Sequence, residues 1–78
     1  MKLTLHILGK KYEIEAPTVS EGLKGLKVPN PKGKGILAVE REGKVKEIVL
    51  HRAVCTRLFT LNGITQDIVI KQIASRFE

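Results

Sequence analysis

The stretch Lys2–Lys27, KLTLHILGKKYEIEAPTVSEGLKGLK, decides the expected fold because it holds two strand signals and a helix signal in succession. Apolar residues alternate with polar ones over residues 3–7, and this period of two predicts a half-buried β-strand. Gly9-Lys10 predicts a two-residue hairpin turn in which glycine supplies the positive φ. A second alternating run over residues 12–16 predicts the returning strand, which Pro17 ends.

The same stretch closes with the start of a helix. Thr18 and Glu21 have the spacing of a capping box, in which the Thr18 hydroxyl accepts a hydrogen bond from the Glu21 amide. One apolar stripe follows at helical spacing, formed by Val19, Leu23 and Leu26. Gly22 and Gly25 each cost an isolated helix about 1 kcal/mol relative to alanine. Packing must therefore hold this helix, and glycine on its packed side would let it lie close to a sheet.

The centre of the chain predicts a second hairpin. Residues 28–35, VPNPKGKG, have the composition of a loop. Gly35–Arg41 and Lys44–Leu50 are rich in β-forming residues and flank Glu42-Gly43, which is a turn signal. The next segment, His51–Leu61, is compatible with a short helix, an edge strand or an ordered loop.

Two structures compete for the segment after Asn62-Gly63, which is itself a turn signal. The β-branched run within Asp67–Ile73 favours a covered, central strand, and we predict a strand here. The helical alternative leaves Ile64 and Ile68 outside a shared face. That face would be formed by Val69, Ile70, Ile73, Ala74 and Phe77.

Size and composition predict a single globular domain over residues 1–78, with 42% apolar residues. No apolar run approaches the roughly 18 residues that a membrane span needs, so no membrane partner is expected. The apolar patch near the N-terminus is too short for a signal peptide, and we expect a cytoplasmic protein. Cys55 is the single cysteine, whereas small secreted domains usually carry several.

The expected order of elements resembles that of the β-grasp, or ubiquitin-like, fold. The pattern over Thr18–Leu26, Ile36–Val39 and Gly43–Val45 is similar to the sulfur-carrier proteins of thiamine and molybdopterin synthesis and to the TGS domains of synthetases and GTPases. Leu61–Gly63, leading to Asp67–Ile70, resembles their final turn and last strand. The resemblance covers nearly the whole chain. It implies an α+β domain with a mixed four- or five-stranded sheet and one helix packed on it.

The C-terminal tail departs from that resemblance. Sulfur carriers end in Gly-Gly, because an activating enzyme must thread an unbranched tail and adenylate its carboxylate. This chain ends Ala74-Ser75-Arg76-Phe77-Glu78, which is bulky and charged. A sulfur-carrier-like role is therefore the least favoured of the functions considered, unless the chain is processed.

A net charge of +6 favours the attraction of polyanions to this protein. Four lysines fall within 11 residues that contain no acid: Lys24, Lys27, Lys32 and Lys34. Lysines on a glycine-containing loop can approach phosphates closely, which gives salt-dependent binding without base specificity. Lys44 and Arg52, from a second basic set that also holds Lys46 and Arg57, complete the predicted polyanion-binding site. The alternative is a solvated basic surface that only aids solubility.

No constellation of residues predicts catalysis, so we expect a non-enzymatic protein without cofactor. His51 lies four residues before Cys55, but nothing in the sequence orients the pair as base and nucleophile. His6 and His51 have no companions at metal-ligand spacing. Tyr12 is on the apolar phase of its strand, so a base-stacking platform is not expected.

The sequence thus predicts a small basic binding module whose partner is RNA, a ribonucleoprotein or another phosphate-rich molecule, as the TGS resemblance also implies. The alternative is a protein-interaction module, such as a subunit or a phage-type assembly factor. Such a module would use an exposed sheet face or an edge strand.

Overall fold

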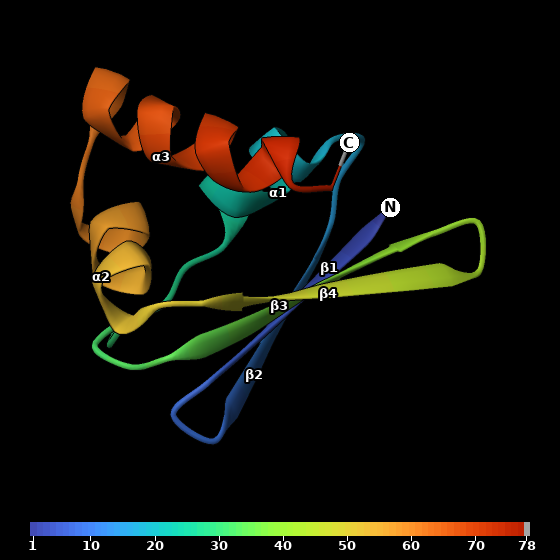
Figure 1. The fold of residues 1–78 in the computed structure, drawn as a ribbon, viewed down its shortest axis with the longest axis horizontal. Coiled ribbons are helices and arrows are strands. Elements are labelled where there is room, and N and C mark those ends of the chain that lie inside the picture. The colour runs from blue at the N-terminus through green and yellow to red at the C-terminus, as the bar shows by residue number, and fades with distance from the viewer. Residues whose placement is uncertain (78) are drawn as a thin grey trace.

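A four-stranded sheet with three helices makes up the fold in a computed structural model, which describes residues 1–77. The elements in chain order are β1 (Lys2–Ile7), β2 (Lys10–Glu15), α1 (Val19–Gly25), β3 (Gly35–Arg41), β4 (Lys44–Leu50), α2 (Arg52–Thr60) and α3 (Gly63–Ser75). The strand order is β2-β1-β3-β4, and every neighbouring pair is antiparallel. Helices α1 and α3 lie on one face of the sheet, and α2 lies at the end where β4 finishes (Figure 1).

The core lies between the sheet and the helices. Leu3, Leu5 and Leu37 are fully buried on the strands at the centre of the sheet. The helices cover them with buried side chains that include Val19, Leu23, Leu58, Ile70 and Ile73. No helix within residues 1–77 covers the other face of the sheet. Ile36, Val45 and Val49 are exposed on that face.

Both predicted hairpins form, and one of them turns a residue earlier than expected. Leu8 and Gly9 occupy the first turn with φ of 52° and 72°, so Lys10 already belongs to β2 and pairs with Ile7. The prediction of Gly9-Lys10 was wrong because both turn positions need positive φ and only one glycine marks them. In the second hairpin Glu42 and Gly43 have φ of 51° and 79°, which confirms the predicted turn.

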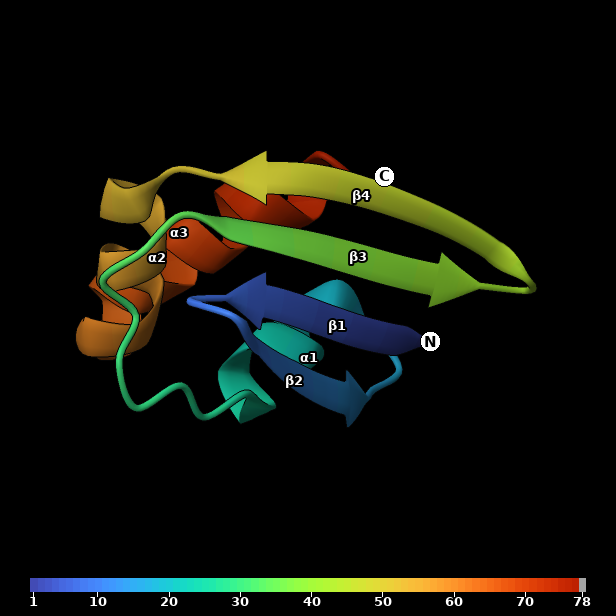
Figure 2. The same ribbon diagram turned by 90° about the horizontal axis from the view of Figure 1, so that it is seen from below.

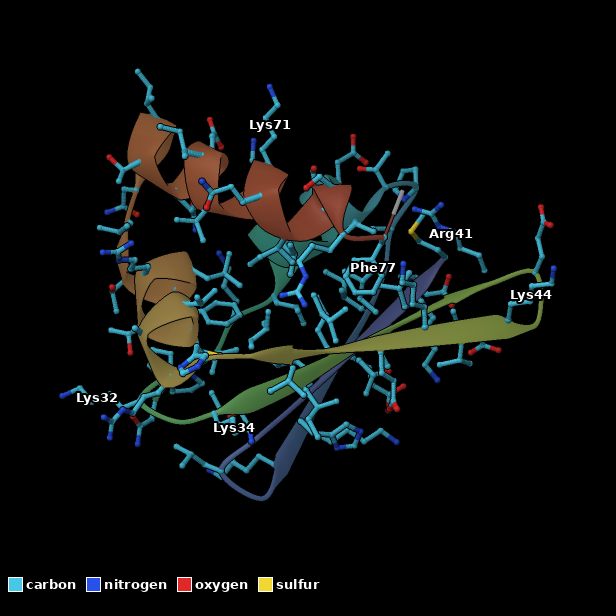
Figure 3. All side chains as sticks on the ribbon, viewed as in Figure 1. Lys32, Lys34, Arg41, Lys44, Lys71 and Phe77 are labelled. Carbon is cyan, nitrogen blue, oxygen red and sulfur yellow. The ribbon has the colours of Figure 1, made fainter. Side chains whose placement is uncertain are left out.

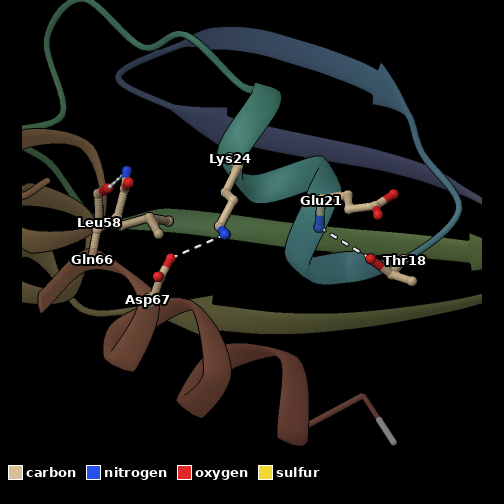
Figure 4. Close-up of polar contacts among 6 residues, drawn as sticks. All are labelled: Thr18, Glu21, Lys24, Leu58, Gln66 and Asp67. Atoms are coloured by element: carbon tan, nitrogen blue, oxygen red, sulfur yellow. Dashed lines mark hydrogen bonds and ion pairs between the residues drawn. The ribbon is translucent and has the colours of Figure 1, made fainter. Parts of the chain in front are cut away.

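Helix α1 depends on its contacts with the sheet, as predicted. The Glu21 amide donates to the Thr18 hydroxyl over 3.1 Å and caps the helix (Figure 4). A Cβ on Gly22 would lie only 2.7 Å from a methyl of Leu3. A Cβ on Gly25 would collide with the Ile14 side chain. Glycine at both positions therefore allows the close approach of this helix to the sheet.

The segment His51–Leu61, for which a helix, an edge strand and a loop were all compatible with the sequence, contains the helix α2. In α2, Cys55 and Leu58 are fully buried and face the core. The rest of the helix is exposed or half-buried. None of the helices within residues 1–77 has the length and apolar composition to cross a membrane.

The predicted C-terminal strand is wrong, because Gly63–Ser75 is the helix α3. Val69, Ile70, Ile73 and Ala74 are buried, whereas Ile64 is 80% exposed. The seven-residue α1 is short, and α3 contributes much of the remaining cover over the apolar sheet face. Burial of the helical stripe therefore outweighs the β-propensity of the Ile-Val-Ile run.

These observations confirm the general α+β class and correct its details. The described part of the sheet has four antiparallel strands instead of a mixed arrangement, and three helices instead of one. Asp67–Ile73, which was predicted to be the equivalent of the last β-grasp strand, lies within the helix α3. The β-grasp resemblance therefore stays a prediction.

Candidate polyanion-binding surface

The net charge of the chain is concentrated in two segments that contain no acid. Residues 22–39 carry four lysines, and residues 48–66 carry two arginines. These six cations equal the whole net charge of +6, since the remaining eight basic residues are matched by eight acidic ones. The protein is thus neutral on balance outside the two segments.

The sheet register joins the two segments in space. Gly35 at the start of β3 pairs with Leu50 at the end of β4. The loop that precedes β3 therefore lies beside the first turn of α2. We call the surface formed by Lys32, Lys34, Arg52 and Arg57 the basic end. Figure 3 shows Lys32 and Lys34 at the end of the sheet next to α2.

Two adjoining hollows form the basic end. The first, of about 630 Å³, is lined by Lys32, Gly33, Lys34, Val49, His51 and Arg52. The second, of about 540 Å³, is lined by Lys32, Arg52, Ala53, Thr56 and Arg57. The hollows share Lys32 and Arg52, and none of these lining residues, all within the described chain, is acidic. An anion that enters either hollow therefore meets positive charge without a competing carboxylate.

The loop that carries the two lysines is held in place. Burial alternates along it, because Pro31 and Gly33 are buried while Lys32 and Lys34 are exposed. The Thr56 hydroxyl of α2 lies 3.5 Å from the Pro31 carbonyl and 3.1 Å from the Arg52 carbonyl, and its single proton is shared between these two acceptors. Gly33 packs against the first hairpin, where a Cβ would lie 2.7 Å from a Leu8 methyl. The alternation thus directs both lysines to solvent on an anchored loop.

Lys24 and Lys27 lie apart from the basic end. The Lys24 ammonium is 3.1 Å from a carboxylate oxygen of Asp67 on α3, in an exposed ion pair (Figure 4). Both lysines line a different hollow, together with Phe59, Leu61 and Gln66. The ion pair offsets the charge of Lys24, so its contribution to polyanion binding is weaker than the sequence predicts.

Lys44 lies at the opposite end of the sheet. It pairs with Arg41 beside the β3–β4 turn, whereas the basic end adjoins Gly35 and Leu50 (Figure 3). Its neighbour Lys46 donates to the Arg76 carbonyl over 2.7 Å, at the C-terminus of α3. The structure therefore brings together three of the six predicted residues, namely Lys32, Lys34 and Arg52.

Arg57 and Lys10 are the cations that the predicted site omitted. Arg57 lines the second hollow of the basic end. Lys10 begins β2 at the same end of the sheet, because Ile7 pairs with both Lys10 and Gly35. The acid-free stretch around Arg52 and Arg57 was a usable signal, but the position of Lys10 depends on strand register.

The Cys55 thiol on α2 is not placed to act as a nucleophile. Cys55 is fully buried, and its thiol lies 3.9 Å from the Leu50 carbonyl. Burial raises the pKa of the Cys55 thiol, which keeps it protonated at neutral pH. Within residues 1–77 no group of three or more His, Cys, Asp or Glu side chains is placed to hold a metal ion.

Comparison of the chain with protein-family models, with curated proteins and with solved structures found no match. The function is therefore argued from the geometry and charge of the surfaces described above.

Proposed function

We propose that this protein is a non-enzymatic binding module that holds RNA, or another phosphate-rich partner, against the basic end. The observation that carries the proposal is the convergence of Lys32, Lys34, Arg52 and Arg57 on two hollows whose lining, within residues 1–77, contains no acid. Guanidinium groups match phosphate oxygens in bidentate geometry, and lysine ammonium groups bind phosphate as point charges.

The basic end is suited to phosphates more than to bases. Tyr12 and Phe59 are half-buried against the core, and Phe77 is buried in it. Sequence-specific recognition of RNA generally uses exposed aromatic side chains on which unstacked bases rest. Binding at this surface would therefore depend on the backbone charge of the nucleic acid and would fall steeply with added salt.

The anchored loop supports this function energetically. Ordering a mobile loop on binding costs about 0.5–1.5 kcal/mol for each immobilised long side chain. The loop here is already fixed by Pro31, Gly33 and the bond from Thr56. The backbone of the loop then adds little to the ordering cost, which falls on the long side chains of the basic end.

A paired charge reversal tests the proposal. Lys32→Glu with Lys34→Glu should weaken binding of a short single-stranded RNA about 100-fold at low salt, because two phosphate contacts become repulsive. The matched control is Lys44→Glu with Lys71→Glu, which changes the net charge equally. Lys44 and Lys71 are exposed and lie away from the basic end (Figure 3). Binding is measured by fluorescence anisotropy over a salt series.

The control variant distinguishes RNA binding at the basic end from a general effect of net charge on affinity. An equal loss of affinity in both double variants would mean that only net charge matters. RNA binding by the unaltered protein that is undetectable even at about 50 mM salt would also reject the proposal.

A protein-interaction role is the second candidate function. It is favoured by the apolar side chains exposed on the helix-free face of the sheet, where Val45 is 60% and Val49 50% exposed. Both belong to β4, the strand at one edge of the sheet.

A further inference from the structure

The strand β4 has an unpaired backbone edge. Within residues 1–77 it pairs only with β3, so its other side presents amide and carbonyl groups without a strand partner. Whereas β4 exposes Val45 and Val49 as well as charged residues, the other edge strand, β2, exposes only charged side chains. There Glu13 forms ion pairs with Lys2 at 2.7 Å and Lys11 at 3.0 Å. β4 instead ends in the apolar residues Ile48, Val49 and Leu50.

Two separate hollows lie along this edge beneath α3. Near Leu50 a hollow of about 280 Å³ opens between β4, α2 and α3, and near Lys44 a second of about 400 Å³ opens beneath Phe77. The bond from Lys46 to the Arg76 carbonyl stands between them, since Lys46 lines one hollow and Arg76 the other. Figure 2 shows α3 behind β3 and β4, reaching to the free edge of β4. We call the two hollows together the β4 groove.

The lining of the β4 groove combines an apolar floor with a cationic rim. The floor near Leu50 also contains Val54, Val69 and Ile73. The rim is formed by Arg57, Arg76, Arg41, Lys44 and Lys46. Glu42 is the single acidic side chain among the lining residues of the described chain. A complementary ligand therefore offers both apolar and acidic groups.

An extended peptide satisfies both requirements. Successive side chains of a β-strand point to opposite faces, so a strand added to β4 directs every second side chain towards α3. Its backbone pairs with the free edge of β4, and its acidic residues reach the cationic rim. Main-chain hydrogen bonds supply affinity in such complexes, and side-chain pockets supply specificity.

A second copy of this chain fits the groove poorly. Pairing β4 with β4 of another molecule would bring Lys44 and Lys46 of both copies to one interface, together with Arg57 and Arg76. Each copy also carries a net charge of +6. Like charges placed close together oppose association. Charge complementarity thus favours an acidic partner over self-association.

We propose that the β4 groove accepts an extended peptide that carries both apolar and acidic side chains on the face it turns to α3 and adds to the sheet as a fifth strand beside β4. The peptide lies under α3, with its apolar side chains on Val54, Val69 and Ile73. Its carboxylates pair with Arg57 and Arg76 at one end and with Lys44 at the other. This partner is a protein segment, and its site shares Val49, His51 and Arg57 with the basic end.

The probe is a synthetic peptide as long as the seven-residue β4, whose α3-facing positions carry glutamate, valine, valine and glutamate in turn and whose other positions carry threonine. Three control peptides accompany it. One replaces glutamate by lysine, and the other two keep the sequence but carry N-methyl groups on one or the other set of alternate backbone amides. Affinity is measured by fluorescence anisotropy, and amide hydrogen exchange of β4 is followed by NMR. We expect weak binding of the lysine peptide and of the N-methylated form whose β4-facing amides are blocked, and slower exchange of the β4 amides that face the groove in the complex with the probe.

A charge reversal on the rim provides the matched protein variants. Arg76→Glu should weaken binding of the acidic peptide about tenfold, because a favourable charge contact becomes repulsive. Lys71→Glu makes the same charge change on the same helix, where the side chain points away from the sheet (Figure 3), and should leave affinity within about twofold. The Arg76 side chain is exposed, and only its backbone carbonyl accepts the bond from Lys46, so folding is spared.

Three results would overturn the proposal. Equal affinity for the acidic peptide and both of its N-methylated forms would show attraction by charge without strand pairing. Unchanged exchange of the β4 amides in the saturated complex would place the peptide elsewhere. Protection of those amides in a peptide-free dimer, identified by light scattering, would show that a second copy occupies the edge.

Discussion

The basic end and the β4 groove are both electropositive, but they differ in what lies beneath the charge. At the basic end the cations stand over an open surface made from a loop and the start of α2, away from any free strand edge. In the groove they surround an apolar floor next to an unpaired strand edge. Charge draws any polyanion to both surfaces, whereas the floor and the backbone edge decide which ligand remains bound. Two cationic surfaces on one small protein can thus select chemically different partners.

The largest expected effect separates the two surfaces directly. Lys32→Glu with Lys34→Glu should lower RNA affinity about 100-fold and leave the affinity for the acidic peptide within about twofold, because neither lysine lines the groove. Arg76→Glu should do the reverse. Parallel titrations of each variant with both ligands provide the measurement. A loss of both ligands in either variant would mean that the two surfaces act as one.

A change at Arg57 should affect both surfaces and therefore should not distinguish them. Its side chain lines the second hollow of the basic end and also the groove near Leu50. Arg57→Glu should therefore weaken both RNA and peptide about tenfold, one charge contact being lost in each complex. A titration of RNA into the peptide complex would add to this result, because occupation of Arg57 by one ligand should weaken the other. Loss of only one ligand would assign Arg57 to that surface alone.

The smallest expected effect concerns the charges on the other edge of the sheet. Hydrogen bonds from Lys2 and Lys11 lower the pKa of Glu13 from 4.5 to about 2. A carboxyl whose pKa is lower in the folded state stabilises the fold above its unfolded pKa, and this stabilisation is lost as the pH falls through the folded value. Stability should therefore decline between pH 4.5 and pH 2 less in Glu13→Gln than in the unaltered protein.

Thermal unfolding at both pH values measures this contribution, which is small because the Glu13 side chain is exposed. An identical decline in the variant and the unaltered protein would show that the ion pairs on β2 are not maintained in solution. The β2 edge would then resemble the β4 edge more closely than the structure indicates.

Local patterns predicted much of this fold from the sequence. Alternation placed β1 and β2, and β-forming residues around the Glu42-Gly43 turn placed β3 and β4. The glycines of α1 predicted its close packing. Local patterns failed at α3, because Asp67–Ile73 is compatible with either structure until the sheet that needs covering is known. The turn at Leu8 was also missed, since leucine gives no signal for a positive φ.

The candidate site was predictable only in part, for a related reason. Lys32 and Lys34 were identified by an acid-free loop, but their meeting with Arg52 and Arg57 requires the pairing of Gly35 with Leu50. The separation of Lys24 depends on the docking of α3, which brings Asp67 to it. The β4 groove depends on that helix as well, and so it lay beyond any inference that began from a C-terminal strand.

The two glycines of α1 also bear on the order in which the chain folds. A seven-residue helix with Gly22 and Gly25 is too short and too weak to persist alone, so it can form only once the hairpin presents Leu3 and Ile14 to it. Each hairpin closes through local contacts, whereas the pairing of β1 with β3 must wait for the long connection through α1. We therefore expect the central ladder of the sheet to form after both hairpins, and α1 to form with it.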